Sequence, residues 1–546
     1  MRTLHTGLAQ ALAVLTLATA CGGASSPDAG STDAGVAPDA PLDAGADAAV
    51  LPPPEASTEH GPLVGVRGDG YQAFLGIPYA APPVGALRWR APRPPEPWTE
   101  RRIASRAPPR CVQGNLGVML PGQEDCLYLS VHTPDPRPSG APVLVWIHGG
   151  AFIFGEGLQA DGGTAGDVLA ARHGLVVVSM NYRLGAYGFL AHPALGAEDD
   201  ASGNYGLADQ IAALEWVQRN IAAFGGDASN VTIAGESAGG RSVCAHLVSD
   251  RTGELFHAAV VQSGLCDATV ETITQGEAQG LALASALGCA DGDVLSCLRS
   301  KTPDEIRAAE PSSGSSVIDW TAWGPHAGGA IVPGQFRARV EAGLFHSVPV
   351  IVGWNADEGT LFVLLGEMSG LVADEAQYLL ATQQLADTYG VAVDAVRAQY
   401  PLASYPEPGA AIADVLGDAA LACPSRRSAR LLADHGAPVW VYHFEYPDAD
   451  FLLGGTRDLG AFHSGEIQFV FGHPGRLGAR RFTGDELALH DAMSGYWARF
   501  VGAHDPNGAG ALAWPAYDST TDRHLVLDRV IAQGTAADAG VCLLWD

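Results

Sequence analysis

The stretch FGGDASNVTIAGESAG, residues 224–239, decides how this chain folds. Its apolar run Val231–Ala234 predicts a buried strand, and the residues after the stretch are compatible with a helix. Between them lies a Gly-x-Ser-x-Gly motif centred on Ser237, in the strand–turn–helix context that a nucleophile elbow requires. So sharp a turn brings Gly235 and Gly239 against neighbouring backbone, where a Cβ would collide, and it projects the serine hydroxyl outward. Ser237 is therefore the candidate nucleophile. The alternative is that the motif forms only a structural turn.

Short apolar runs recur on both sides of this turn. Several are apolar at consecutive positions, as strands buried on both faces require. The runs cover residues 127–131, 143–147, 175–179, 258–262, 348–353 and 439–444. Helical patterns lie between them, such as residues 206–224, whose apolar side chains follow three- and four-residue spacing. The alternation predicts an α/β fold with a large, mostly parallel central sheet and helices on both faces, and it places the chemistry beyond the carboxyl ends of the strands.

A glycine turn, HGGAF at residues 148–152, follows one of the predicted strands. A serine hydroxyl is a poor nucleophile unless a base takes its proton and donors receive the negative oxygen that forms on the substrate. The turn is like the oxyanion loops of serine hydrolases. The predicted donors are the backbone N–H groups of Gly150, Ala151 and Ala238, with Gly149 shaping the turn. The alternative is that these glycines only form a tight loop.

Together these motifs resemble those of the type-B carboxylesterase/lipase family, which includes carboxylesterases and cholinesterases. Residues 224–239 match the family's serine signature, and EDCLYLSV at residues 124–131 matches its second signature. Residues 74–80, 82–85 and 204–210 are also similar to conserved stretches of the family. The resemblance extends from about residue 61 to residue 546 and implies one catalytic domain with the α/β-hydrolase fold, in an exported bacterial member.

The resemblance also implies a chain order of serine, acid and histidine. The acid of the family usually lies in an Asp-Glu-Gly context, which here is Asp357-Glu358-Gly359 after the predicted strand 348–353. Asp357 competes with Glu358, but neighbouring side chains at a strand end point in different directions, and the resemblance favours Glu358. His463, within residues 462–472, matches the family's histidine loop and is the predicted base.

The implied function is hydrolysis of largely uncharged carboxylic esters through an acyl-enzyme, with no cofactor and no metal ion. An amide, carbamate or thioester hydrolase using the same triad is the alternative, and a non-catalytic adhesion module of the same fold is a more distant one. Glu236, Ser263 and Glu466 resemble polar groups that support the family's histidine. Ordinary buried hydrogen bonding is the alternative role for these three.

The expected pocket is apolar. In cholinesterases a Trp inside the loop closed by the first disulfide stacks on a quaternary ammonium. The loop of residues 112–125 contains no aromatic residue, so we expect no preference for choline esters. The residues that fall where the family has its pocket walls are Phe152, Phe154, Trp320 and Trp323. Residues 324–329 depart from the family's usual pattern.

The cysteines indicate an oxidising compartment. Apart from Cys21 there are eight of them, and an even number in an exported chain favours disulfides, although the count does not fix the pairing. The resemblance implies the pairs Cys111 with Cys126, Cys289 with Cys297, and Cys423 with Cys542. Cys244 and Cys266 remain as a candidate fourth pair, the alternative being two buried free thiols.

The N-terminus predicts export. Residues 1–20 have the charged start, apolar centre and small final residues of a signal peptide. Cys21 after Ala-Thr-Ala resembles a bacterial lipobox and is the candidate lipidation site of a membrane-anchored lipoprotein; cleavage after Ala20 and secretion is the alternative. Residues 21–60, rich in Asp, Ala, Gly and Pro, predict a disordered linker.

The charge of the chain limits its partners. The formal net charge is −29, which repels phosphate backbones and anionic lipids. We therefore expect a small-molecule ester substrate, no nucleic-acid partner, and membrane contact only through the lipid anchor. The sequence does not indicate an oligomeric state.

Overall fold

A computed structural model describes residues 51–114, 122–159, 163–311, 323–449, 458–474 and 481–546. The chain divides into two units, Met1–Pro52 and Pro53–Asp546. Every helix and strand named below lies in the second unit. The predicted signal peptide, Cys21 and the linker as far as residue 50 lie outside the described residues.

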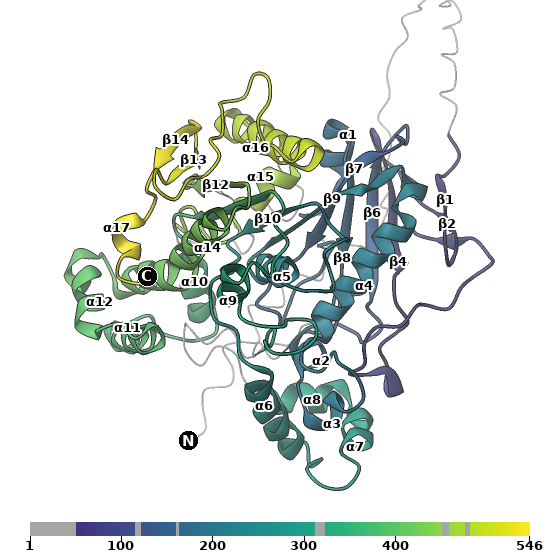
Figure 1. Ribbon diagram of the computed structural model, residues 1–546, viewed down its shortest axis with the longest axis horizontal. Helices are drawn as coiled ribbons and strands as arrows, with labels where there is room; N and C mark the ends of the chain where they lie inside the picture. The colour runs from purple at the N-terminus through teal and green to yellow at the C-terminus, as the bar shows by residue number, and fades with distance from the viewer. Residues whose placement is uncertain (1–50, 115–121, 160–162, 312–322, 450–457, 475–480) are drawn as a thin grey trace, which may run out of the picture. The chain divides into compact units, whose positions relative to one another are not determined.

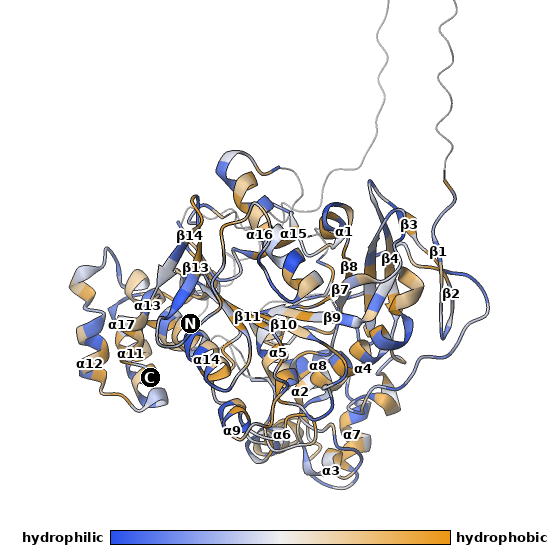
Figure 2. Ribbon diagram, turned by 45° about the horizontal axis from the view of Figure 1, so that its top comes forward, coloured by the Kyte–Doolittle hydropathy of each residue, from blue (hydrophilic) through white to orange (hydrophobic). Residues whose placement is uncertain are grey.

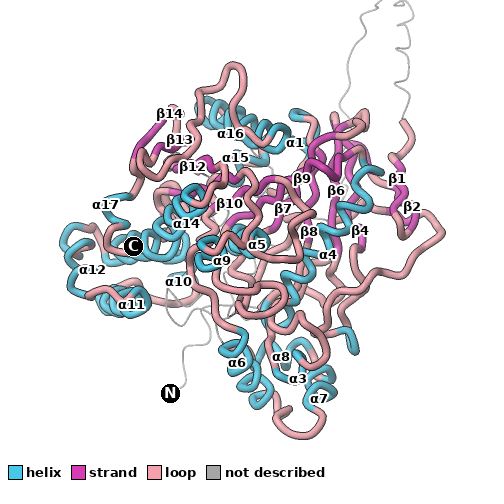
Figure 3. Tube along the Cα trace, viewed as in Figure 1, coloured by secondary structure: helices cyan, strands magenta, loops and turns pink. Residues whose placement is uncertain are grey.

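An eleven-stranded sheet forms the centre of the second unit, and it is the long magenta band in Figure 3. The strand order is β14-β13-β12-β11-β10-β9-β7-β8-β6-β4-β3. From β8 through to β13 all neighbours are parallel, whereas β14 at one edge and β6, β4 and β3 at the other pair antiparallel. The strands are β3 (Val66–Arg67), β4 (Tyr71–Pro78), β6 (Tyr128–Pro134), β7 (Ala141–Ile147), β8 (Val176–Met180), β9 (Gly226–Glu236), β10 (Ala258–Gln262), β11 (Val350–Asn355), β12 (Val439–Phe444), β13 (Arg523–Leu527) and β14 (Ala532–Thr535). The predicted mostly parallel sheet is confirmed.

The sheet is covered on both faces, which explains its consecutive apolar residues. In β7, Val143, Val145 and Ile147 belong to the core that α4, α5 and α14 close, while Leu144 and Trp146 belong to the core under α1, α15 and α16. Figure 1 shows α1 and α16 along one side of the sheet and α4 and α5 on the other. The apolar runs of β10 and β11 are orange in Figure 2, as strands inside such a sandwich should be.

The helices connect successive strands and extend the fold beyond the sheet. They are α1 (Asp167–His173), α2 (Gly185–Phe189), α3 (Pro193–Gly196), α4 (Tyr205–Asn220), α5 (Ala238–Leu247), α6 (Ile273–Ala286), α7 (Val294–Ser300), α8 (Pro303–Ala309), α9 (Phe336–Glu341), α10 (Thr360–Met368), α11 (Glu375–Tyr389), α12 (Val393–Gln399), α13 (Pro408–Gly417), α14 (Cys423–Asp434), α15 (Ile467–Phe471), α16 (Gly484–Ala503) and α17 (Ala539–Cys542). A π-helical segment, Asp418–Ala422, joins α13 to α14.

The ordered part begins earlier than the sequence predicts. Residues up to 60 are expected to belong to the linker, yet β1 (Glu55–Thr58) pairs antiparallel with β2 (Gly61–Val64), and β2 pairs with β5 (Arg102–Ile103) in a small second sheet. The side chain of Ala56 is buried in the main core. The boundary at residue 60 is therefore wrong, because pairing with β2 orders a segment that is polar in composition.

Four disulfides join the described cysteines: Cys111–Cys126, Cys244–Cys266, Cys289–Cys297 and Cys423–Cys542. The pair left open by the sequence, Cys244 with Cys266, is thus bridged, between α5 and the residues just after β10. Four bridges indicate a protein of an oxidising compartment outside the cytosol. No described helix combines the length and apolar character that crossing a bilayer demands.

Candidate functional site

Ser237 occupies the sharp turn between β9 and α5. Its backbone is left-handed, with φ 57° and ψ −122°, a conformation that costs energy for a residue with a side chain. The turn is held by the Ser237 N–H, which donates to the carbonyl oxygen of Gln262 at 2.8 Å. A Cβ on Gly235 would overlap the backbone of Gly239, and one on Gly239 would overlap the carbonyl of Ile147. Both glycines are therefore required, and the elbow projects a partly exposed serine.

The candidate residues meet because they follow four neighbouring parallel strands. The sheet order β11-β10-β9-β7 places the carboxyl ends of these strands side by side. Glu358 follows β11, Ser263 follows β10, Ser237 follows β9 and the glycine turn 148–152 follows β7. Parallel strands collect their final loops at one edge.

Glu358 is the carboxylate that contacts His463. Its Oε2 lies 2.5 Å from Nδ1 of His463, and its Oε1 accepts hydrogen bonds from the Ser263 hydroxyl at 2.6 Å and from the Asn355 N–H at 2.9 Å. Both Glu358 and His463 are buried. Asp357 instead accepts a hydrogen bond from the Ala461 N–H at 2.8 Å. The structure thus separates the two neighbouring acids as the sequence predicts.

The other ring nitrogen of His463 also faces a carboxylate. Nε2 lies 3.0 Å from Oε1 of Glu236. Although burial lowers the pKa of His463, the charges of Glu236 and Glu358 raise it to about 9. Carboxylate oxygens only accept hydrogen bonds, so this environment favours the imidazolium, which has two donors. Among the hydrogen bonds of the described residues, none joins the Ser237 hydroxyl to the His463 ring. Ser237 and His463 nevertheless line the same cavity.

A buried polar network lies behind His463. Glu466 accepts from the Gln262 side-chain amide at 2.8 Å and from the Asn355 side-chain amide at 2.7 Å. Asn355 also donates to the carbonyl oxygen of Phe462, next to His463, at 2.7 Å. Burial raises the pKa of Glu466, although both amides act against it. Of the three predicted supporting residues, Glu236 contacts His463 and Ser263 contacts Glu358, whereas Glu466 is linked to this region through Asn355.

Sequence reasoning missed Asn355 and Gln262. The available signal was their position, because each is a polar residue at the end of an apolar strand, β11 or β10, at the edge where the chemistry collects. A polar side chain at such a place has to be satisfied by a partner, and here the partner is Glu466.

The predicted oxyanion donors surround the serine. Gly150 has φ 107° and Ala151 has φ 52°, and Ala238 is the first residue of α5. Within the described residues the backbone N–H groups of these three donate no hydrogen bond. A Cβ on Gly149 would lie 2.8 Å from the carbonyl oxygen of Glu236, so this glycine allows the turn to approach the elbow.

Two cavities meet at Ser237. The larger, of about 370 Å³, is lined by His463, Glu236 and the glycine turn and has Phe154 in its wall. The smaller, of about 120 Å³, is almost wholly apolar and has Phe152 in its wall. The lining shared by both is Ala151, Ser237 and Phe362.

One predicted pocket residue of the described part of the chain lines neither cavity. Trp323 is buried in the main core and lines neither of them, so its place in the pocket wall stays a prediction. Trp320 lies outside the described residues. In that same described part, no cluster of His, Cys, Asp and Glu is arranged to hold a metal ion.

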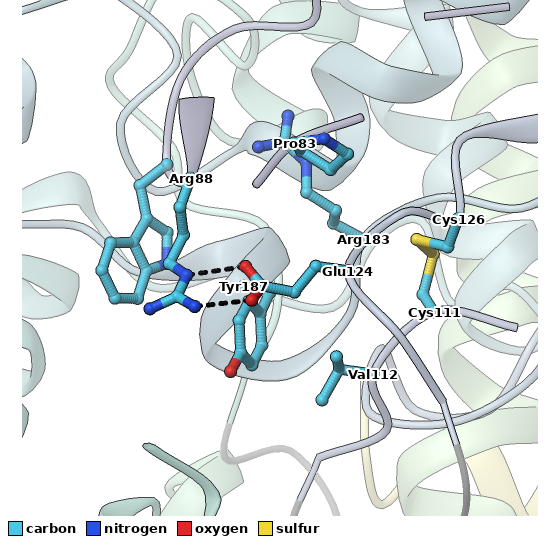
Figure 4. A pocket seen from close by; sticks show the side chains of 9 residues that line it. Pro83, Arg88, Cys111, Val112, Glu124, Cys126, Arg183 and Tyr187 are labelled. Atoms are coloured by element: carbon cyan, nitrogen blue, oxygen red, sulfur yellow. Dashed lines mark hydrogen bonds and ion pairs between the residues drawn. A yellow bond between two sulfur atoms is a disulfide. The ribbon is translucent and has the colours of Figure 1, made fainter. Parts of the chain in front are cut away.

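A third hollow lies beside the first disulfide, away from the serine (Figure 4). It holds the ion pair of Glu124 with Arg88, at 2.5 Å and 2.6 Å, next to Cys111–Cys126. The Arg88 guanidinium also donates to backbone carbonyls near Lys301. Glu124, the first residue of the second signature, thus has a structural role, since the pair ties the disulfide loop to the segment after α7.

Comparison with known proteins gives a consistent assignment. The model of the carboxylesterase family matches residues 52–540. An acetylcholinesterase of Bungarus fasciatus is 34% identical over 516 residues, which cover 88% of this chain and 83% of the relative. A cholinesterase of Mus musculus is 35% identical over 499 residues, which cover 85% of this chain and 80% of the relative.

Proposed function

Because the chain belongs to the carboxylesterase family, we propose that it hydrolyses carboxylic esters with Ser237 as nucleophile, His463 as general base and Glu358 as the acid that orients the base. The observation that carries the proposal is the buried contact of 2.5 Å between Glu358 and His463, beside the serine elbow and at the edge of the same cavity. No single motif would place these three groups together.

In the proposed mechanism, His463 in its neutral form accepts the Ser237 proton as the hydroxyl attacks the ester carbonyl. Substrate binding has to bring the hydroxyl and Nε2 together, as is common for catalytic hydrogen bonds that are long in the free enzyme. His463 then gives the proton to the leaving alcohol, and water hydrolyses the acyl-enzyme by the same route. Glu358 holds the ring and stabilises its cation.

The negative oxygen of the tetrahedral intermediate would be held by the N–H groups of Gly150, Ala151 and Ala238. Such a donor contributes about 3 kcal/mol to transition-state stabilisation. The left-handed backbone at Ala151 supports this role, because strained backbone persists where it positions groups for function.

The leaving alcohol is proposed to be uncharged. The relatives named above are cholinesterases by name, but the first disulfide loop of this chain has no aromatic residue in its sequence to stack on a quaternary ammonium. Part of that loop, residues 115–121, lies outside the described residues. The apolar walls of the smaller cavity, which include Phe152, Leu265 and Leu416, support carboxylic esters with short acyl groups.

The test is the Ser237→Ala variant. It should lose hydrolysis of a short neutral ester by at least about a thousandfold, while Ser369→Ala, at an exposed serine of the same chain, should not. The wild type should be labelled by a fluorophosphonate at Ser237. Labelling without ester turnover would favour the amide, carbamate or thioester alternative, and absence of labelling would favour an adhesion module.

We also infer that the protein is exported with residues 1–20 as signal peptide and Cys21 as a bacterial-type lipid anchor, residues 21 to about 54 serving as a tether. The four disulfides support export. Mass spectrometry of the mature N-terminus tests the anchor: a diacylated Cys21 supports it, and an unmodified N-terminus contradicts it.

A further inference from the structure

The two cavities at Ser237 have different chemical roles. The leaving alcohol takes its proton from His463, so it has to lie on the side of that ring. His463 lines the larger cavity and not the smaller one. The acyl group of a bound ester is therefore directed into the smaller cavity, on the far side of Ser237.

An arginine lies in the wall of this otherwise apolar cavity. Arg241 is four residues after Ser237, its N–H donates to the Ser237 carbonyl oxygen at 2.9 Å, and it lines the cavity together with Leu265 and Leu421. One helical turn is a rise of about 6 Å, and side chains on a helix lean toward its N-terminus. Arg241 thus lines a cavity that Ser237 also lines, and it borders a second hollow with Cys244 and Phe336.

The charge of Arg241 is not matched by an acid. Its Nη2 donates to the carbonyl oxygen of the exposed Thr269 at 3.0 Å, while its Nε is buried and has no hydrogen-bond partner. No carboxylate of the described residues forms an ion pair with it. The ionisable groups that act on it are Tyr389 and Glu271, and neither bonds to it. Burial lowers the pKa of Arg241, because apolar surroundings disfavour the charged form.

Arg241 is half-buried, and the fully buried arginines of the described chain contrast with it. Arg183 pairs with Asp209, at 2.7 Å, and Arg88 pairs with Glu124. A cation that is partly withdrawn from water and has no counter-ion is stabilised when a ligand supplies one. At this position the acyl group of a substrate is the candidate ligand.

We propose that Arg241 is a specificity-determining residue that binds a carboxylate at the far end of the acyl group, so that the enzyme prefers half-esters of short dicarboxylic acids. A guanidinium holds a carboxylate by two parallel hydrogen bonds, which neutral acyl chains cannot offer. The inference rests on the proposed esterase function. It replaces the expectation of an uncharged acyl group and leaves the expectation of an uncharged alcohol as it is.

The cavity has the size for such a group. At roughly 30 Å³ for each water-sized group, 120 Å³ holds about four of them, which suits a succinyl or glutaryl chain. In the reaction the ester C–O bond breaks as the Ser237 oxygen bonds to the acyl carbon, and His463 moves the serine proton to the alcohol. Water then releases the acid, so the products are one alcohol and one dicarboxylate.

The test compares monomethyl glutarate with methyl 5-methylhexanoate, in which an isopropyl group replaces the terminal carboxylate. Methyl esters are used because a neighbouring carboxylate attacks activated aryl esters unaided. Acid release is followed in a pH-stat at about 0.15 M salt, where the Debye length of about 8 Å screens the net charge of the protein. The wild type should have the higher kcat/KM for the half-ester, and in Arg241→Met the ratio of the two kcat/KM values should fall by about tenfold or more.

Arg251→Met is the matched control, because Arg251 is exposed and pairs with Asp200; its ratio should equal that of the wild type. Arg241→Lys should keep part of the preference. A ratio that is the same in wild type and Arg241→Met overturns the inference.

Wild-type inhibition keeps the inference falsifiable if the Arg241 variants do not fold. Glutarate should inhibit hydrolysis of the neutral ester more strongly than 5-methylhexanoate does, and equal inhibition overturns the inference. Turnover of the neutral ester with no preference for the half-ester overturns this inference alone. Absence of all turnover and of fluorophosphonate labelling overturns the proposed function itself.

Discussion

Replacing Glu236 by glutamine should move the pH dependence of the enzyme to lower pH. In the proposed mechanism the neutral form of His463 is the base, so activity should rise as pH passes through its pKa, which the two flanking carboxylates raise to about 9. At 3.0 Å and an effective dielectric constant of about 20, one carboxylate stabilises the imidazolium by roughly 5 kcal/mol, or roughly four pKa units. A glutamine at this position still presents a dipole to His463, and water reorients around the uncharged side chain. We therefore expect the pKa of His463 to fall by about one to three in Glu236→Gln.

The assay is kcat/KM for a neutral ester in a pH-stat from about pH 6 to about pH 10, because this parameter reports the pKa of the free enzyme. At pH 7 the neutral fraction of His463 should rise from about one in a hundred to at least about one in ten. Glu254→Gln, at an exposed glutamate, is the control and should leave the midpoint unchanged. A midpoint in Glu236→Gln equal to or above that of the wild type would refute the electrostatic argument.

Three further outcomes are expected. Ser263→Ala removes the 2.6 Å hydrogen bond to Glu358. Because a hydrogen bond to a charged group contributes a few kcal/mol, kcat should fall about ten- to a hundredfold with little change in KM. An unchanged kcat would contradict a positioning role for Ser263. Gly239→Ala should abolish activity or folding in expression and activity assays, because its Cβ overlaps the Ile147 carbonyl, whereas Gly540→Ala has open space and should behave as wild type. Removing Cys423–Cys542, which closes 119 residues, should cost about 5 kcal/mol, against about 2.5 kcal/mol for the 8-residue loop of Cys289–Cys297. Calorimetric Tm values would measure this difference, and equal losses would speak against the loop-entropy explanation.

The strands and the elbow were accessible from sequence because their signals are local. The predicted run 231–234 lies inside β9, and the predicted run 258–262 has the same first and last residues as β10. The glycines around Ser237 indicate the turn by their steric requirement alone. In contrast, the linker boundary at residue 60 failed, because pairing between β1 and β2 is a contact that composition does not report.

The candidate site was only partly accessible. Glu358 rather than Asp357 contacts His463, and its role as the acid stays a prediction. The contact of Glu236 with His463, and with it the direction of the histidine pKa, depends on a distance across the fold. The residue type of Trp323 suits a pocket wall as well as a core. Which of the two its indole occupies depends on the side chains that surround it.

The sequence by itself determined the kind of fold, the serine elbow and the family, because hydrophobic periodicity, glycine sterics and motif order are properties of neighbouring residues. Only the tertiary structure decided which nitrogen of His463 faces which carboxylate, that two cavities meet at Ser237, and that Arg241 lines the smaller one without an ion-pair partner among the described residues. Electrostatic energies depend on distance and burial between groups far apart in the chain, and those quantities exist only once the sheet has brought the strand ends together.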